Sequence, residues 1–563
     1  MKITKYLFLL SLIIFLSFLF RLFRIDQIRL THDEMSIGYN AYSILKTAKD
    51  EWGRFLPLDF EAFGDHKLPL YIYTAVPFVY LFGLSELSVK MPSILAGVIL
   101  VALIYFLTKK LLKNRNTALL SAALIAFSPA TIQLSRSGLE ANLALSLFTA
   151  AILTTLFYLK DKRSSIHLSI LSGILFALTF YTYIAYRLLI FFIFGIIILL
   201  ADSRKKIKLS LISLLTCLVF ILPILPQMLG NSGTARFSQV GILNNPGIVD
   251  GINDRRSFCY LTGPKYLPKI CKFIYNKPIA YSEIFIKSYL QTLSPEFLFF
   301  KGDSHIYLNN PDFAEFYIIL LPFYLLGIYT AFKNRDLASK LILSIFFIAP
   351  IPAALVGEAQ IVRASILILP ATYLSSLGIT QAFSLIKNKI LFKKIFSLSL
   401  TAIFIFLTTS YLINTYYVYP QKYDENFYRL AKELVFEVEK IKNNYDLIYV
   451  SDKFADAHIL FSFYGQYDPS WYQENILRKD EDSFGFSHAQ TLGKIEFGSE
   501  SPEALLCQTD KKILYISENR KESGGLLKEF KSFSGVHVQA ELIDTSFWRH
   551  ELESQGKLET SCP

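Results

Sequence analysis

The chain begins MKITKYLFLLSLIIFLSFLFRLFR, residues 1–24, in which an apolar run over 6–20 lies between two pairs of basic residues. Such a start resembles a secretory signal peptide, but no small-x-small cleavage site follows the apolar run. We therefore predict an uncleaved first membrane-spanning helix, flanked by Lys2 and Lys5 on one side and Arg21 and Arg24 on the other.

The composition of the whole chain agrees with this start. Of 563 residues, 53% are hydrophobic and only 18% are charged, against about a quarter in a typical soluble protein. The 49 Phe and 33 Tyr are typical of chains that face lipid and its interfaces. This composition excludes a disordered protein, a disulfide mini-protein and an ordinary soluble enzyme, and it indicates an all-α polytopic membrane protein.

Ten further apolar runs follow the first, and a helix needs about 20 apolar residues to cross a bilayer. We therefore predict about 11 transmembrane helices. The ten runs lie near 91–108, 117–134, 140–159, 166–182, 184–200, 209–229, 314–332, 340–356, 362–385 and 395–413.

One more apolar stretch, Leu68–Leu84, is placed by the positive-inside rule. If the N-terminus is cytoplasmic and this stretch does not cross, every basic cluster in a short loop falls on the cytoplasmic side, as the rule requires. We therefore predict that 68–84 forms interfacial helix or re-enters on the outer side. The clusters are Lys109/Lys110/Lys113/Arg115, Lys160/Lys162/Arg163, Arg204/Lys205/Lys206/Lys208, Lys333/Arg335/Lys340 and Lys387/Lys389/Lys393/Lys394.

This topology predicts a plasma-membrane core over 1–413, with outer loops at about 25–90 and 230–312. The composition changes after it, and 414–563 is predicted to be an extracytoplasmic soluble α/β domain. A charged helical stretch, Asp424–Lys442, precedes two strand-like runs, Asp446–Val450 and Lys512–Ser517. The net charge of +11 comes from loop clusters and not from a basic stripe with interleaved aromatics, so we expect no nucleic-acid partner.

Four of the five cysteines fall outside by the same topology. Two disulfides, Cys259–Cys271 and Cys507–Cys562, would form in an oxidising compartment, although free thiols fit the spacing equally well. The fifth, Cys217, is predicted to be a packed thiol within a span.

The first candidate motif is Thr31-His32-Asp33-Glu34, just after the first span. A carboxylate at a membrane-proximal cavity suits a general base, and adjacent acids point in different directions on a helix. The alternative is a helix N-cap at Thr31 or Asp33. The residues alone leave both interpretations open.

The second motif, GDHKLPLY over 64–71, places Lys67 at the outer headgroup level. Its ammonium could bind a lipid phosphate or simply snorkel to the interface. Asp65 and His66 could in principle join His32 and Asp33 in a metal site, but the spacing matches no known ligand pattern. We predict no metal or cofactor, while a divalent ion is not excluded.

The third motif, SRSGLEAN over 135–142, carries Arg136 and Glu140 at i and i+4, where they would share a helical face. They form either part of a site or a mutual ion pair. Farther along, Arg363 begins a span from outside, where a guanidinium could bind a phosphate or anchor the helix at the interface. The chain lacks a Gly-rich phosphate loop and a Gly-x-Ser-x-Gly elbow, which points away from nucleotide-driven and serine-hydrolase chemistry.

These motifs together resemble the C-type membrane glycosyltransferases, in particular bacterial relatives of the protein O-mannosyltransferases and of the aminoarabinose transferases of lipid A. The resemblance covers roughly 1–415 and rests on motifs in a fixed order. They are Asp33-Glu34, HKLPLY (66–71), SELSVKMPS (85–93), SRSGLEANL (135–143) and Arg363.

The resemblance implies an inverting transfer of a mannose-like hexose from a polyprenyl phosphate donor to an acceptor hydroxyl on the outer face. It implies that Asp33 is the general base, with Glu140 as second acid, and that Lys67 and Arg363 bind the departing phosphate. Arg136 would assist the phosphate or position Glu140, and Glu34 and His66 would support the site. Relatives often carry Asp where this chain has Glu140.

The acceptor could be a protein, a lipid or a glycan, and membrane lipids are expected partners. A rival interpretation is a polytopic transporter or flippase with an outer binding domain. That interpretation would predict internal repeats and broken helices near the membrane centre, which the sequence does not show.

Overall fold

The structure, a computed structural model, describes all residues except 1, 29, 63–64, 161–164, 230–240, 245, 263–266, 307–308, 387–389, 424–429, 455, 482–486, 509–510, 519–523, 534–536 and 557–563. The chain forms two compact units. We call residues 1–23 and 93–415 the membrane unit, and residues 24–92 and 416–563 the loop–tail unit.

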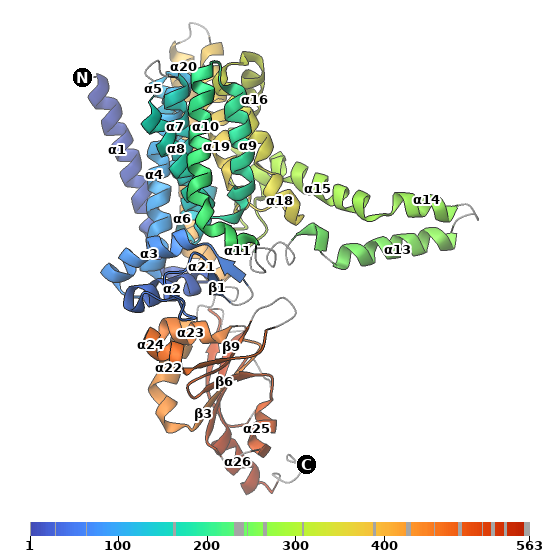
Figure 1. Cartoon of the computed structure of the whole chain (residues 1–563). Helices are drawn as coiled ribbons and strands as arrows, with labels where there is room; N and C mark the ends of the chain where they lie inside the picture. The colour runs from blue at the N-terminus through green and yellow to red at the C-terminus, as the bar shows by residue number, and fades with distance from the viewer. Residues whose placement is uncertain are drawn as a thin grey trace. The chain divides into compact units, whose positions relative to one another are not determined.

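The membrane unit is a bundle of apolar helices (Figure 1). Among the described residues, seven helices are long and apolar enough to cross a membrane, or eight if one bent pair counts as a span. This confirms a mostly helical, multi-pass membrane protein. The seven are Thr4–Gln27, Glu86–Leu112, Glu140–Lys160, Arg204–Met228, Leu337–Val356, Ser365–Leu385 and Ile390–Lys422.

The bent pair consists of α5 (Arg115–Phe127) and α6 (Pro129–Arg136), which meet at 52°. Ser128 breaks the helix there because it caps α6, and its hydroxyl accepts a hydrogen bond from the Thr131 amide at 3.3 Å. Proline at the first position of α6 lacks the amide proton that a continuous helix would need. The three other expected spans coincide with apolar helices that are shorter: α8 (Ile166–Phe180), α9 (Ile184–Leu200) and α16 (Leu321–Asn334).

Close helix packing in the bundle depends on two glycines between α16 and α19 (Ile368–Leu385). A Cβ added at Gly327 would lie 1.9 Å from the Leu374 carbonyl oxygen, and one at Gly378 would lie 1.7 Å from that of Phe323. Small residues let helix backbones approach in this way within membranes. The two glycines therefore allow α16 and α19 to pack with their backbones in close contact.

The remaining elements of the membrane unit include a long helical hairpin, α13–α15, that projects from the side of the bundle (Figure 1). The elements not yet given are α1 (Lys2–Leu22), α4 (Glu86–Leu112), α7 (Glu140–Lys160), α10 (Arg204–Ile221), η2 (Leu222–Ile224), α11 (Leu225–Leu229), η3 (Ile242–Asn244), α13 (Pro246–Thr262), α14 (Leu267–Ile274), α15 (Lys277–Leu293), η4 (Glu296–Lys301), η5 (Ile318–Leu320), α17 (Leu337–Ile348), α18 (Ile351–Val356), η6 (Ser365–Leu367), α20 (Ile390–Ile413) and η7 (Asn414–Val418).

The loop–tail unit joins the first loop to the C-terminal part of the chain. The first loop contains η1 (Ile25–Gln27), α2 (His32–Thr47), a two-stranded ribbon of β1 (Phe60–Ala62) and β2 (Asp65–Lys67), and α3 (Pro69–Phe82). The helix α3 is apolar but only 14 residues long. Whether it lies in the interface, as the charge pattern predicts, stays a prediction.

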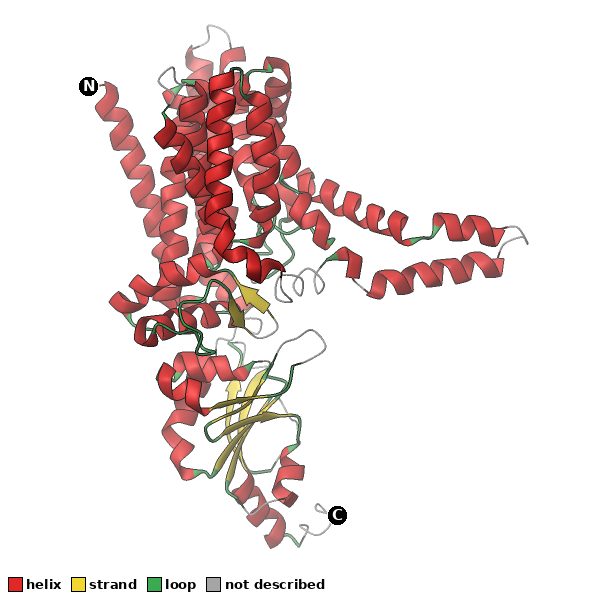
Figure 2. Cartoon of the chain, in the orientation of Figure 1, coloured by secondary structure: helices red, strands yellow, loops and turns green. Residues whose placement is uncertain are grey.

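The tail is a mixed α/β domain, as the sequence predicted (Figure 2). Its sheet, in the described residues, has the order β4-β5-β6-β3-β7-β9-β8, and the two predicted strands coincide with β3 (Leu447–Ser451) and β7 (Ile513–Ser517), which pair in parallel. The other elements are α21 (Tyr419–Lys422), α22 (Ala431–Ile441), η8 (Lys442–Asn444), α23 (Ala457–Tyr464), α24 (Pro469–Asn475), β4 (Ile476–Arg478), β5 (Ala489–Leu492), β6 (Ile495–Gly498), α25 (Pro502–Gln508), β8 (Leu526–Lys531), β9 (Val538–Asp544) and α26 (Thr545–Ser554).

The tail packs directly on the first loop. Gly38 of α2 leaves so little room that an added Cβ would lie 2.6 Å from the Phe463 ring of α23. The Tyr39 hydroxyl donates to the Tyr467 carbonyl at 3.1 Å, and the Tyr39 and Tyr472 rings meet at 5.1 Å. These contacts make one unit of two segments that lie at opposite ends of the sequence.

Candidate functional site

At the start of α2, the two adjacent acids of the first motif have different partners. Thr31 caps the helix: its hydroxyl accepts from the Glu34 amide at 3.3 Å, and the Glu34 carboxylate accepts from the Thr31 amide at 2.8 Å. This reciprocal pair is a capping box. Glu34, predicted to support the site, is therefore buried in the cap, while Asp33 points elsewhere.

Asp33 meets Lys67 across the first loop. The Lys67 ammonium lies 2.5 Å from the Asp33 carboxylate, although the residues are 34 positions apart. The Lys67 side chain is 4% exposed and that of Asp33 is 54% exposed. Lys67 ends strand β2, paired with Phe60 of β1, so the ribbon holds the ammonium beside the start of α2. The structure thus joins the predicted base to a predicted phosphate ligand.

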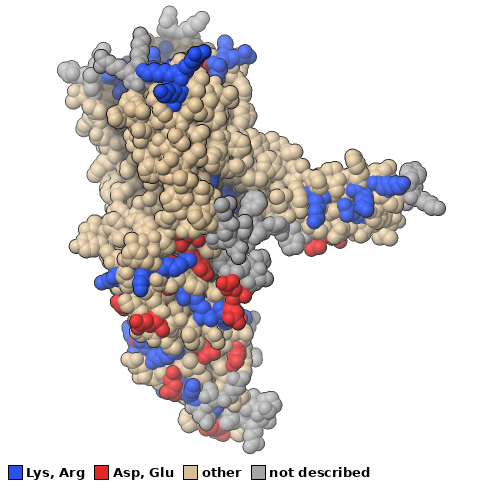
Figure 3. All heavy atoms as spheres, viewed as in Figure 1, with Lys and Arg blue, Asp and Glu red and all other residues tan. Residues whose placement is uncertain are grey.

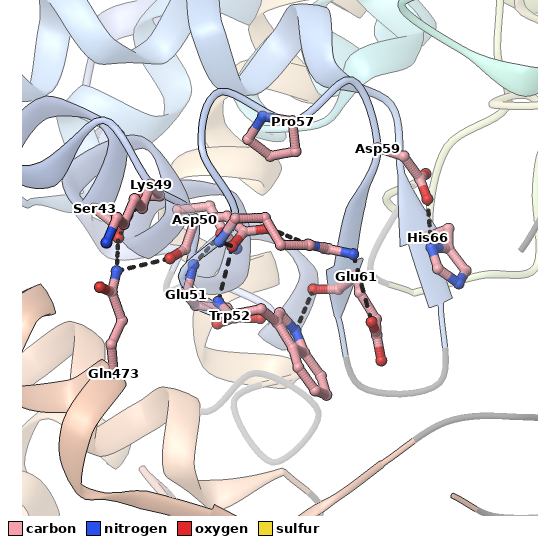
Figure 4. A network of polar contacts seen from close by, with 12 residues as sticks. Ser43, Lys49, Asp50, Glu51, Trp52, Pro57, Asp59, Glu61, His66 and Gln473 are labelled. Atoms are coloured by element: carbon pink, nitrogen blue, oxygen red, sulfur yellow. Dashed lines mark hydrogen bonds and ion pairs between the residues drawn. The ribbon is translucent and has the colours of Figure 1, made fainter. Parts of the chain in front are cut away.

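Two histidines flank this pair. Burial lowers the pKa of His32, the first residue of α2, to about 4, so its ring is neutral at physiological pH. His66 lies 2.7 Å from the Asp59 carboxylate and is held by the loop (Figure 4). Gly64 of this motif lies outside the described residues.

A polar network fixes the loop between α2 and β1 (Figure 4). The Asp50 carboxylate accepts from the Trp52 amide at 3.0 Å and from the Arg54 amide at 2.8 Å, and it pairs with the Arg54 guanidinium at 2.7 Å. The Trp52 indole donates to the Glu61 carbonyl at 3.0 Å. These hydrogen bonds fix the loop that leads into the ribbon, and the ribbon carries Lys67.

The tail completes the network. The Gln473 amide donates to the Asp50 carbonyl at 2.8 Å, and Arg478 lies 3.6 Å from the centre of the Trp52 ring. Burial raises the pKa of Glu51 to about 7, although the nearby Arg478 opposes the shift. The sequence around Glu51 carries no signal of this burial, because the residues that bury it come from the distant tail.

A second group missed by sequence analysis lies in the tail, around a cavity of about 280 Å³. Asp456 and His488 line it at 3.6 Å from each other, with the buried His458 nearby. Burial raises the pKa of Asp456, and Asp33 and Lys67 are close enough to influence it. The tail thus adds titratable groups beside the Asp33–Lys67 pair.

The other predicted residues belong to the membrane unit. Arg136, at the end of α6, is buried and donates to the backbone carbonyls of Arg21 at 3.2 Å and Phe23 at 2.7 Å. It therefore ties α6 to the end of α1. Glu140 is the first residue of α7 and is half-buried.

Arg363 lies in the turn before η6, close enough to His305 to influence its charge. Hydrogen bonding to Asp303, at 3.2 Å, raises the pKa of His305, and the Gln360 amide contacts the same ring at 2.8 Å. The second oxygen of Asp303 accepts from the Ile361 amide at 2.7 Å. This polar cluster was also missed, because its members come from two loops far apart in the sequence.

The described residues contain one of the two predicted disulfides. Cys259 and Cys271 form a disulfide with their Cα atoms 6.1 Å apart, whereas Cys562, the predicted partner of Cys507, lies outside the described residues. Across the described part of the chain, no three His, Cys, Asp or Glu side chains group as ligands for a metal ion.

The fold defines a multi-pass membrane protein, and the loop–tail unit carries a polar site formed by the first loop and the tail. Residues 65–229 match the family described as dolichyl-phosphate-mannose-protein mannosyltransferase, a segment that contains Lys67, Arg136 and Glu140. This match agrees with the resemblance seen in the motifs, and it covers less than a third of the chain. No curated protein matches the chain in sequence.

Solved structures share the fold. The oligosaccharyltransferase of Archaeoglobus fulgidus, in complex with zinc and sulfate, matches with a TM-score of 0.51 and 15% identity over 81% of this chain and 61% of its own. The same protein tethered with an acceptor peptide matches with a TM-score of 0.50 and 16% identity over 82% and 63%. This chain thus spans less than two thirds of the length of that protein.

ArnT from Cupriavidus metallidurans in the apo state covers nearly the whole chain. Its TM-score is 0.45 and its identity 10%, over 97% of this chain and 98% of its own.

Proposed function

We propose that this protein transfers a mannose-like hexose, with inversion, from a polyprenyl phosphate donor to an acceptor hydroxyl on the outer face of the membrane. The observation that carries the proposal is the 2.5 Å contact between Asp33 and Lys67. A carboxylate beside an ammonium provides a proton acceptor and a phosphate ligand within one site. The acceptor is a protein, a lipid or a glycan.

In the proposed reaction, Asp33 removes the proton from the acceptor hydroxyl. The acceptor oxygen attacks the anomeric carbon, the bond from that carbon to the phosphate oxygen breaks, and its electron pair leaves on polyprenyl phosphate. Lys67 stabilises the charge that develops on the leaving phosphate.

The ion pair between Asp33 and Lys67 would make donor binding precede deprotonation of the acceptor. Before donor binding, the Lys67 ammonium pairs with the Asp33 carboxylate. A donor phosphate that takes over the ammonium would release Asp33 to act as base. The site would then be activated by its own donor.

Arg363 and Glu140 complete the proposed machinery. Arg363, close to His305, would bind the donor phosphate through its planar fork, and Glu140 would orient acceptor or sugar. The hydrogen bonds from Arg136 to the carbonyls of Arg21 and Phe23 favour a structural role, in which it ties α6 to the end of α1, over direct phosphate binding.

We further propose eleven crossings with a cytoplasmic N-terminus and an extracytoplasmic tail, so that α8, α9 and α16 also cross. Lys and Arg side chains gather at the bundle end where α10 begins and α16 ends (Figure 3), as the positive-inside rule requires of a cytoplasmic end. The Cys259–Cys271 disulfide, which needs an oxidising compartment, supports an outer location for the 230–312 loop.

The test is release of polyprenyl phosphate by purified protein in nanodiscs supplied with radiolabelled polyprenyl phosphate hexoses. Asp33→Asn is expected to lower release by about 10²–10⁴-fold, the usual effect of losing a general base. Asp26→Asn, an exposed acid of the same unit, is the matched control and should turn over normally. Near-normal turnover of Asp33→Asn would remove the base assignment, and no release with any hexose would return weight to a transporter.

A further inference from the structure

The hairpin α13–α15 of the membrane unit is held together by three contacts between its two arms. The Arg256 guanidinium of α13 donates to the Tyr275 carbonyl at 2.6 Å, and Arg255 pairs with Glu283 of α15 at 3.1 Å. The Cys259–Cys271 disulfide links α13 to α14 near the tip. These three contacts, spread along the hairpin, hold one arm against the other.

The root of the hairpin is fixed to the end of the span formed by α17 and α18. The Tyr289 hydroxyl of α15 donates to the Phe347 carbonyl of α17 at 2.7 Å. Where α18 ends, a Cβ added at Gly357 would lie 3.0 Å from the Ile284 side chain and 2.9 Å from that of Ile242. The hairpin therefore leaves the bundle at the level where a span reaches the membrane surface.

From this root the arms run across the direction of the bundle helices (Figure 1). A helix of 17 residues, such as α15, is about 26 Å long at 1.5 Å per residue. Arms of this length, leaving a span end at a steep angle, lie along the plane of the membrane surface.

The arms expose large apolar side chains that an aqueous surface would not favour. In α14, Ile270, Phe273 and Ile274 are spaced i, i+3 and i+4, so they share one face of the helix. The most exposed apolar side chains are Phe258 at 70%, Leu261 at 82%, Phe273 at 76%, Ile286 at 54% and Leu290 at 59%.

Basic residues accompany this apolar surface and outnumber acidic ones. Figure 3 shows Lys and Arg along the visible face of the arms. Long basic side chains beside an apolar face can reach the headgroups of anionic lipids while the apolar residues enter the acyl region. The basic residues described are Arg255, Arg256, Lys269, Lys272, Lys277 and Lys287, and the acidic ones are Asp250, Asp254 and Glu283.

We propose that α13–α15 is a membrane-surface anchor: its apolar side chains insert into the headgroup–acyl boundary of the leaflet at its root, and its basic side chains bind anionic phospholipids. By the predicted topology this is the outer leaflet. The proposal needs only a multi-pass bundle and does not depend on the proposed glycosyl transfer.

The test places a fluorescent reporter on each side of α14 in the full-length protein in proteoliposomes. Phe273→Trp should be quenched by brominated phospholipids roughly threefold more strongly than Lys272→Trp, whose side chain lies on the opposite face of the helix. The signal of the native Trp52, Trp471 and Trp548 is subtracted with wild type. Quenching of the Phe273→Trp variant should deepen when phosphatidylglycerol replaces part of the phosphatidylcholine.

Equal quenching at both positions by aqueous iodide, with no lipid quenching, would overturn the proposal. So would protection of Phe273→Trp that depends on protein concentration and not on brominated lipid, because a second copy of the chain would then cover this face. If Phe273→Trp does not fold, Phe258→Trp on α13 gives the same readout. Its exposed fraction of 70% predicts strong quenching by brominated lipid.

Discussion

Lys67 and Arg136 are both buried cations within the segment that matches the family model, but their partners differ. Lys67 pairs with the half-exposed carboxylate of Asp33, and under the proposed function an incoming phosphate would compete for this ammonium. Arg136 donates to two main-chain carbonyls at the end of α1, which a ligand cannot displace without opening the chain. Burial is therefore common to both cations, and we expect their different partners to decide which of them could bind a phosphate.

Of the two cations compared, Lys67 should show the larger effect on transfer. Lys67→Ala is expected to lower transfer by about 10²–10³-fold, the usual effect of losing one group that stabilises transition-state charge. The loss should appear in the dependence on donor concentration, measured as release of polyprenyl phosphate. Lys67→Arg, which keeps the charge, is the matched variant and should recover part of the activity. An unchanged donor dependence in Lys67→Ala would separate Lys67 from the phosphate and break the comparison.

A smaller effect concerns the packing that holds Lys67 in place. The pKa of Glu51 is raised to about 7 by burial, so the folded state keeps a proton that the unfolded state loses near pH 4.5. Stability should therefore fall as pH rises between these values, by about 3 kcal/mol in total. Glu51→Gln should remove this dependence.

The measurement is thermal unfolding of the detergent-solubilised protein at pH 5 and pH 8. Glu474→Gln, an exposed acid of the same unit, is the control and should keep the wild-type pH dependence. If Glu51→Gln behaves like wild type, the carboxyl of Glu51 is not the group that the tail buries at a free-energy cost.

The smallest effect is expected for Arg136, the second cation of the comparison. Arg136→Ala should destabilise the protein by about 2 kcal/mol, because the carbonyls of Arg21 and Phe23 lose charge-assisted hydrogen bonds. Activity per folded molecule and its donor dependence should stay close to wild type. A donor dependence weakened as much as in Lys67→Ala would instead make Arg136 a phosphate ligand.

Much of the fold follows from the sequence. Apolar runs and basic clusters are local signals, and they predicted a multi-pass helical membrane protein with an α/β tail, including strands β3 and β7. The same signals predict the number of spans less well: among the described residues, seven or eight helices are long and apolar enough to cross a membrane. Eleven runs are apolar, yet α8, α9 and α16 have only 15, 17 and 14 residues, because turns and caps end each helix within its apolar run.

The motifs placed Asp33 and Lys67 in one candidate site, but the sequence could not show that they touch. The capping box of Thr31 and Glu34 is local, and the sequence left a helix N-cap open there as an alternative. The contact between Asp33 and Lys67 and the packing of the tail on Gly38 instead depend on residues far apart in the sequence. Glu51, Asp456 and His305 were missed for the same reason. Composition and periodicity record which residues avoid water, so the sequence determined the class of protein. Which polar groups meet depends on chain reversals that bring separate segments together, and only the tertiary structure decided that.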